Sequence, residues 1–112
     1  MTWLEHHTQS VKHAIQAEII LRNDDSFFKN AAIKQYLLAA EAEGRAFDAL
    51  RPEQIRTISI TAVSVASLWY KANDFKQAEI AVRKGLAIEN LQEFAVLQLE
   101  SILQAIKEQI TK

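Results

Sequence analysis

AVSVASLWYKANDFKQAEIAVRKGLAIEN, residues 62–90, contains two segments of helical periodicity separated by the polar pair Asn73 and Asp74. Apolar residues in each segment recur at intervals of three and four, which places them on one face of an α-helix. These residues are Ala62, Val65, Ala66, Trp69, Phe75, Ala78, Val82, Gly85 and Leu86. Because large and small residues alternate on both faces, the stretch predicts two antiparallel helices that pack closely across a tight turn.

The order of these residues resembles that of a tetratricopeptide repeat, a helical hairpin of about 34 residues. Trp69 stands at the position of the tyrosine before the turn, Ala66 at that of the glycine, and Ala78 at that of the early alanine of the second helix. The chain departs from the family at three positions. The family usually has a tryptophan at the position of Ala62, an aromatic residue at that of Val82 and a proline at that of Asn90. The resemblance implies a scaffold that binds other proteins, without naming the partner.

Composition limits the class of protein. The chain has 112 residues, a formal net charge of −1, two glycines, one proline and no cysteine. It therefore predicts one all-α domain without disulfides or thiolate metal ligands. Acidic and basic residues are interspersed, which disfavours general nucleic-acid binding. The longest uninterrupted apolar run is residues 36–40 and the N-terminus lacks a signal pattern, so we expect a cytoplasmic protein that does not span a membrane.

Capping patterns and periodicity predict five antiparallel helices over about 2–22, 26–50, 52–72, 74–88 and 90–110. Three capping boxes support these starts: Thr2 with Glu5, Asp74 with Gln77, and Asn90 with Glu93. Asp25 or Ser26 can cap the second helix, and Pro52 suits the first position of the third. Asn73 tolerates the left-handed conformation that the turn before Asp74 requires.

Three further predictions concern the third, second and first helices. Residues 58–65, ISITAVSV, are rich in β-branched residues typical of strands, yet we expect a buried helix between the two halves of the domain. Gly44 either ends the second helix or lies inside it as a point of close packing, and the phase of the apolar residues favours one long helix. On the first helix we expect the apolar residues to face the core: Leu4, Val11, Ala14 or Ile15, Ile19 and Leu21.

The resulting architecture is a single tetratricopeptide-like domain over residues 1–112. It comprises a clear repeat at about 59–90, a degenerate hairpin at about 2–50 and a C-terminal capping helix at about 91–110. The degenerate hairpin rests on Ala32, Tyr36 and Ala39, which follow the small, aromatic, small order of the family's second helix.

No pattern of residues predicts catalysis, a cofactor or a metal. His6 and His13 share a helix face near Glu5, but zinc normally takes three or four protein ligands. We interpret all three histidines, His7 included, as solvated or partner-facing. Nucleases of the HEPN type carry a histidine shortly after an arginine, whereas every histidine here precedes Arg22, so only an inactive relative remains open. We interpret the acidic residues as a capping turn and a solvated helix face: Asp24, Asp25, Glu41, Glu43 and Asp48.

In tetratricopeptide proteins the first helix of each pair lines a concave groove that receives a peptide or a partner helix. Carried onto this chain, the groove residues are Ile60, Val63, Ser64, Ser67, Tyr70 and Lys71. Aliphatic and hydroxyl groups dominate, so the resemblance implies an apolar peptide or helix rather than a carboxylate ligand. The alternative is that Ile60, Val63 and Tyr70 are core contacts to the neighbouring helices.

The last helix carries more apolar residues than one stripe needs. A terminal helix of a solenoid has a polar outer face, so the surplus predicts a homodimer or contact with another chain. The predicted interface residues are Phe94, Leu97, Leu99, Ile102, Leu103, Ile106 and Ile110.

The leading hypothesis is therefore a non-enzymatic adaptor that binds a protein or peptide. The alternative is a helical accessory protein of a larger complex, an inactive HEPN-like relative among the options, which binds through the first helix and the acidic turn.

Overall fold

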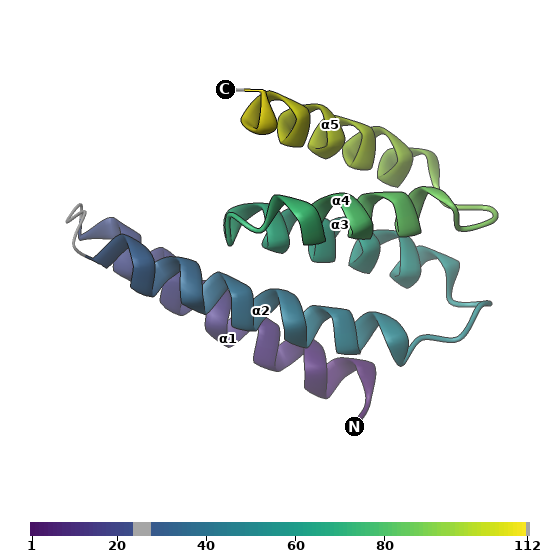
Figure 1. Cartoon of the computed structure of the whole chain (residues 1–112). Coiled ribbons are helices and arrows are strands. Elements are labelled where there is room, and N and C mark those ends of the chain that lie inside the picture. The colour runs from purple at the N-terminus through teal and green to yellow at the C-terminus, as the bar shows by residue number, and fades with distance from the viewer. Residues whose placement is uncertain (24–27, 112) are drawn as a thin grey trace.

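The computed structural model describes residues 1–23 and 28–111, and these form five α-helices and no strand. Figure 1 shows the order of the helices along the chain. They are α1 (Trp3–Arg22), α2 (Lys29–Asp48), α3 (Ile55–Lys71), α4 (Phe75–Leu86) and α5 (Glu93–Ile110). The all-α class predicted from the sequence is confirmed, including a helix over the β-branched run at 58–65.

Each helix packs against the next one in the chain, and α3 also contacts α5. In Figure 1, α1 and α2 lie side by side along their lengths, and α3, α4 and α5 form the other half of the molecule. The molecule measures 44 × 36 × 19 Å. Because α3 packs against α2, α4 and α5, it is the helix that joins the two halves, as expected from its apolar character.

Two predicted helix starts are confirmed by their hydrogen bonds. The Thr2 N–H donates to Glu5 Oε1 at 3.1 Å, and the Glu5 N–H donates to Thr2 Oγ1 at 3.2 Å, a complete capping box. Before α4, Asp74 Oδ1 accepts the Gln77 N–H at 3.1 Å. Asn73 has a φ of 59°, so it takes the left-handed conformation predicted for the turn.

Two other starts were predicted wrongly. Asn90 does not cap α5, since its φ of 65° places it in the turn, and Gln92 precedes the first helical residue. The Gln92 N–H donates to Ser59 Oγ on α3 at 3.1 Å, so a tertiary contact replaces the local cap. Helix α3 begins at Ile55 rather than Pro52, which lies in the preceding turn. The predicted cap of α2, Asp25 or Ser26, lies outside the described residues.

Two clusters of buried side chains hold the helices together. The C-terminal cluster lies between α3, α4 and α5 and consists of Ala66, Ala78, Val82, Leu99 and Ile106, all fully buried. The N-terminal cluster joins α1, α2 and the end of α3 and consists of Ala17, Ala32, Tyr36 and Ala72. Small residues dominate the second cluster, so α1 and α2 can approach closely.

The face of α1 that packs on α2 is not the one predicted. Five large residues predicted to face the core are 41–61% exposed: Leu4, Val11, Ile15, Ile19 and Leu21. Of the two alternatives given for one position, Ala14 is half-buried and Ile15 is exposed. The buried positions of the helix are Ser10 and Ala17. Small side chains permit close contact with the alanines of α2, which leaves the larger apolar residues in solvent. We call the exposed residues Leu4, Val11, Ile15 and Ile19 the α1 stripe.

Both glycines lie inside helices, but their surroundings differ. Gly44 lies within α2, which confirms one long helix, yet a Cβ built there meets nothing within 4 Å, so the close-packing interpretation was wrong. A Cβ at Gly85 would lie 2.7 Å from Leu99 Cδ1 and 3.5 Å from Ala62 Cβ. Gly85 is therefore the point at which α4 approaches α3 and α5.

The same substitution should thus have opposite effects at the two glycines. We expect Gly44→Ala to raise the free energy of unfolding by about 0.5–1 kcal/mol, because alanine restricts the unfolded chain and favours the helix. Gly85→Ala should lower it by about 1–2 kcal/mol, because the new methyl group displaces a buried leucine. Urea titrations followed by circular dichroism at 222 nm would measure both, and equal shifts in one direction would contradict the packing described for Gly85.

Candidate functional site

A groove lies between α1 and α3, with α2 beneath it. Its cavity volume is about 270 Å³. The lining residues come from three helices: His7, Ser10, Val11 and Ala14 of α1, Glu43 of α2, and Val63, Ser64, Ser67, Leu68 and Lys71 of α3. We call this hollow the α1–α3 groove. Apolar and hydroxyl side chains make up most of its wall, and Lys71 supplies a positive charge.

The structure brings together four of the six residues proposed for partner binding. Val63, Ser64, Ser67 and Lys71 all line the α1–α3 groove. Ile60 and Tyr70 do not belong to that lining. Ile60 is 47% exposed, whereas Tyr70 packs on the C-terminal cluster, lies 5.4 Å from the Phe75 ring and accepts a hydrogen bond from Gln109 Nε2 at 3.3 Å.

An acid–histidine pair forms part of the groove. His7 Nδ1 lies 2.9 Å from Glu43 Oε1 and 3.2 Å from Oε2. The Glu43 residue is only 2% exposed, whereas the His7 side chain is 35% exposed. Burial raises the pKa of the Glu43 carboxyl above its ordinary value, and the hydrogen bond from His7 opposes this shift. The pair therefore ties α1 to α2, with the carboxyl group buried and the imidazole partly exposed.

Trp3 connects this pair to α3. Its indole ring stacks on His7, with ring centroids 4.6 Å apart and an interplanar angle of 9°. The indole N–H donates to Thr61 Oγ1 at 3.1 Å, and Thr61 is almost fully buried. Because α1 and α3 otherwise face each other across the groove, this hydrogen bond holds the two walls together near the start of α1.

The interpretation of two histidines and one glutamate must be corrected. His7 and His13 are not simply solvated, because His7 pairs with Glu43 and His13 Nδ1 lies 2.8 Å from Gln35 Oε1, both on α2. Glu43 does not belong to a solvated face. The sequence does contain a signal for the burial of Glu43, because Glu43 lies at intervals of three and four from the buried residues Tyr36, Ala39 and Ala46. His7 lies at the same intervals on the α1 face that carries Ser10, Ala14 and Ala17.

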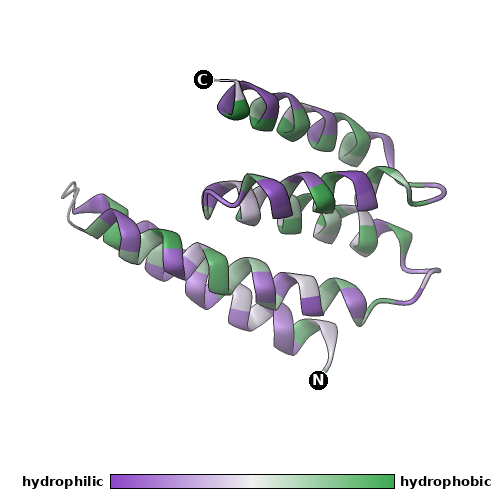
Figure 2. Cartoon of the chain, viewed as in Figure 1, coloured by the Kyte–Doolittle hydropathy of each residue, from purple (hydrophilic) through white to green (hydrophobic). Residues whose placement is uncertain are grey.

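The predicted interface residues on α5 divide into three groups. Leu99 and Ile106 are fully buried within the chain and belong to its C-terminal cluster. Ile102 and Leu103 are half-buried against that cluster. Phe94, Leu97 and Ile110 are 40–62% exposed, so these three are the members available to a partner. In Figure 2 the ribbon of α5 alternates green and purple, because apolar and polar residues alternate along this helix.

Neither a metal cluster nor a membrane span occurs in the described part of the chain. No three histidine, cysteine, aspartate or glutamate side chains gather there, and none of its helices combines the length and apolar character needed to cross a bilayer. Searches against protein families, curated proteins and solved structures found no match to this chain.

Proposed function

We propose that the protein is a non-enzymatic interaction module that binds an apolar peptide or helix of a partner protein in the α1–α3 groove. The observation that carries this proposal is the lining of the groove: three helices contribute apolar and hydroxyl side chains around a hollow of about 270 Å³. Such a wall suits apolar side chains of a peptide and offers serine hydroxyls to its backbone.

The position of the groove also supports a tetratricopeptide-like arrangement. We propose that α1 with α2, and α3 with α4, are antiparallel hairpins of two such repeats and that α5 caps the second. In that arrangement the first helices of the two hairpins line the shared groove, and α1 and α3 are the helices that contribute most of its lining. The resemblance in residues 62–90 is the other support for it.

Charged side chains placed in the groove should abolish partner binding. We expect Ser67→Arg to remove the partner from affinity captures made with lysate of the native host, because the long cationic side chain fills the hollow. Ser101→Arg is the matched control, since Ser101 is exposed on α5, far along the chain from the groove residues. Quantitative mass spectrometry of the captured proteins would compare the two variants with the wild type.

Loss of the same partner with Ser101→Arg, and its retention with Ser67→Arg, would contradict the groove as the binding surface. Circular dichroism and thermal unfolding of both variants would establish that each is folded before the capture is interpreted.

A second candidate function is favoured by the α1 stripe. Four large apolar side chains lie 41–61% exposed on one helix, and a neighbouring subunit of a larger complex could cover them. This corresponds to the accessory-protein hypothesis, in which the first helix is the contact surface. Ile15→Lys would disrupt such a contact without entering the groove, because Ile15 does not line it.

Self-association through α5 also remains a proposal. Phe94 and Leu97 lie three residues apart, so they share one exposed face of the helix, which a second copy could bury. We expect a dimeric mass by size-exclusion chromatography with light scattering at about 50 μM protein, a concentration that would populate contacts of micromolar affinity. Leu97→Lys should return the mass to that of a monomer, whereas a monomeric wild type would contradict the proposal.

A further inference from the structure

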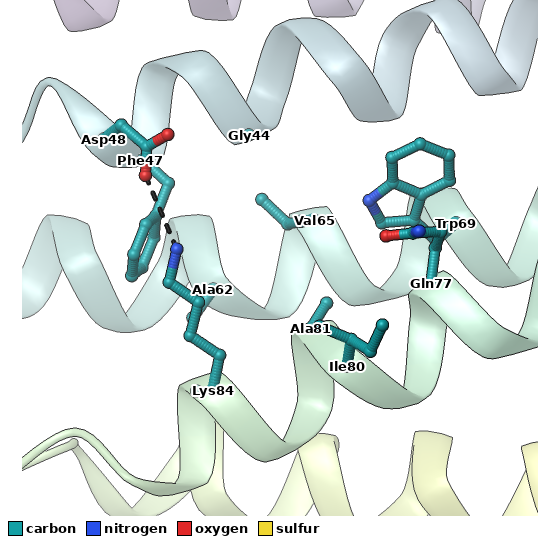
Figure 3. Close-up of a pocket in the computed structure, with 11 residues that line it drawn as sticks. Gly44, Phe47, Asp48, Ala62, Val65, Trp69, Gln77, Ile80, Ala81 and Lys84 are labelled. Carbon is teal, nitrogen blue, oxygen red and sulfur yellow. Dashed lines mark ion pairs between the residues drawn. The ribbon is translucent and has the colours of Figure 1, made fainter.

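A second hollow lies on the opposite side of α3 from the groove, between α2, α3 and α4. Residues 62, 65 and 69 of α3 line it, and they are rotated by roughly half a turn from the groove residues 63, 64, 67 and 71. Its cavity volume is about 180 Å³. We call it the α2–α4 pocket, and Figure 3 shows its lining.

The interior of the pocket is apolar and has aromatic rings at its two ends. Val65 and Ala81 lie in its middle, with Trp69 at one end and Phe47 at the other (Figure 3). Polar groups stand at the same two ends. Gln77 lies beside Trp69 in Figure 3, and Lys84 Nζ lies 3.5 Å from Asp48 Oδ1 and 5.0 Å from the centre of the Phe47 ring.

Gly44 gives the pocket part of its volume. Glycine inside a helix is less stable than alanine by about 1 kcal/mol, so a packing reason normally accompanies it. The described residues offer no such reason, because a Cβ at Gly44 would meet none of their atoms within 4 Å. Gly44 lines the α2–α4 pocket instead, and any side chain there would extend into the hollow. The glycine thus leaves room for a ligand in the pocket.

We propose that the α2–α4 pocket binds one small aromatic ligand that carries a single hydrogen-bonding substituent. The size fits, since an apolar cavity of about 150 Å³ accommodates benzene. Trp69 and Phe47 offer ring faces or edges to an aromatic ligand. Gln77 or Lys84 can hydrogen-bond a substituent such as a phenolic hydroxyl at either end. The site is separate from the groove, so this inference stands independently of the proposed function.

The two tryptophans allow a direct test by NMR with p-cresol as the probe. Trp69 lines the pocket, whereas Trp3 stacks on His7 beside the groove. In ¹H–¹⁵N spectra of the full chain, we expect p-cresol to shift the indole N–H signal of Trp69 in a saturable manner and to leave that of Trp3 unchanged. The expected Kd is about 0.1–1 mM for a ligand of this size.

Substitutions that fill the pocket distinguish specific binding from weak surface contact. Gly44→Phe should weaken p-cresol binding at least tenfold, and Gly44→Ala should weaken it by less than threefold. Ala81→Leu, on the opposite wall, gives a second filled variant if the first does not fold. Absence of a saturable Trp69 shift, equal shifts at Trp3, or unchanged affinity in both filled variants would overturn the proposal. Equal affinity for cyclohexanol would overturn its assignment to an aromatic ligand.

Discussion

Leu99→Ala is expected to lower the free energy of unfolding by about 3 kcal/mol, within the range of about 2–5 kcal/mol seen for such truncations. Leu99 is fully buried in the C-terminal cluster with Val82 and Ile106. Its truncation removes apolar burial and leaves a cavity where α3, α4 and α5 meet. Ile60→Ala is the control. Ile60 lies on α3, is 47% exposed and belongs to none of the proposed binding surfaces, so its truncation should change stability by much less, no more than about 1 kcal/mol.

A double-mutant cycle with Gly85 tests the same contact more sharply. A methyl group at position 85 would lie 2.7 Å from Leu99 Cδ1 in the wild type, but that atom is absent after Leu99→Ala. Gly85→Ala should therefore destabilise the wild type and stabilise the Leu99→Ala variant by about 1 kcal/mol. Urea titrations of the four proteins would measure the cycle, and additive effects would contradict direct packing of Leu99 against Gly85.

His7→Ala should lower the free energy of unfolding by about 2–3 kcal/mol at pH 7. The substitution leaves the Glu43 carboxyl group, 2% exposed, without its hydrogen-bond partner, which costs about 1–3 kcal/mol. It also removes the ring that stacks on Trp3, worth about 0.5–1.5 kcal/mol. His7→Asn is the matched control, because its amide can place an N–H near the position of Nδ1. We expect Asn to retain more stability than Ala at pH 7 by urea titration.

The effect of His7→Ala should depend on pH through Glu43. Burial raises the folded-state pKa of Glu43 above its ordinary value, so the folded state holds this proton more tightly than the unfolded state. The contribution of Glu43 to stability is therefore full below about pH 4.5 and is lost as the pH rises through the folded-state pKa. His7→Ala removes the hydrogen bond that lowers this pKa. The folded-state pKa of Glu43 therefore rises further, and more of the stability is lost as the pH rises.

The stability difference between wild type and His7→Ala should consequently be smaller at pH 4 than at pH 7. Comparing the two proteins at each pH cancels the titration of other carboxyl groups. A Glu43→Gln background should remove most of the pH dependence of this difference. A difference that is constant with pH in both backgrounds would contradict the assignment to Glu43.

Local signals in the sequence predicted the number and type of the helices well. Thr2, Asn73 and Asp74 act through bonds within their own segments, so their roles could be read without knowledge of the fold. Asn90 failed because the start of α5 is held by Ser59 of α3, which lies far away in the sequence. Propensity for strands in residues 58–65 was overridden in the same way, by packing against three other helices.

The orientation of α1 could not be predicted from hydrophobicity. Two stripes on this helix share the same periodicity, one with Leu4, Val11 and Ile15 and one with Ser10 and Ala17. The more apolar stripe is exposed, because the alanine-rich face of α2 favours small residues opposite it. Knowledge of the α2 surface is needed to choose between them.

The candidate site was predicted in part. The repeat resemblance placed Val63, Ser64, Ser67 and Lys71 in one groove, and the structure brings them together. Glu43 was missed because an acidic residue on a helix is usually solvated, and its burial depends on His7, which lies 36 residues earlier in the chain. The α2–α4 pocket was not predicted, since it depends on how three helices are spaced rather than on any sequence pattern.

The most direct test of the groove is to map a bound peptide at residue resolution. Peptides would be selected from a random display library against the wild-type chain, and the tightest binder titrated in ¹H–¹⁵N NMR spectra. We predict that the largest amide shifts fall on groove residues of both walls, Ser10 and Ala14 on α1 and Ser64 and Ser67 on α3, and that Ser67→Arg abolishes them. Shifts confined to α5 or to the α1 stripe, with binding retained by Ser67→Arg, would contradict the account.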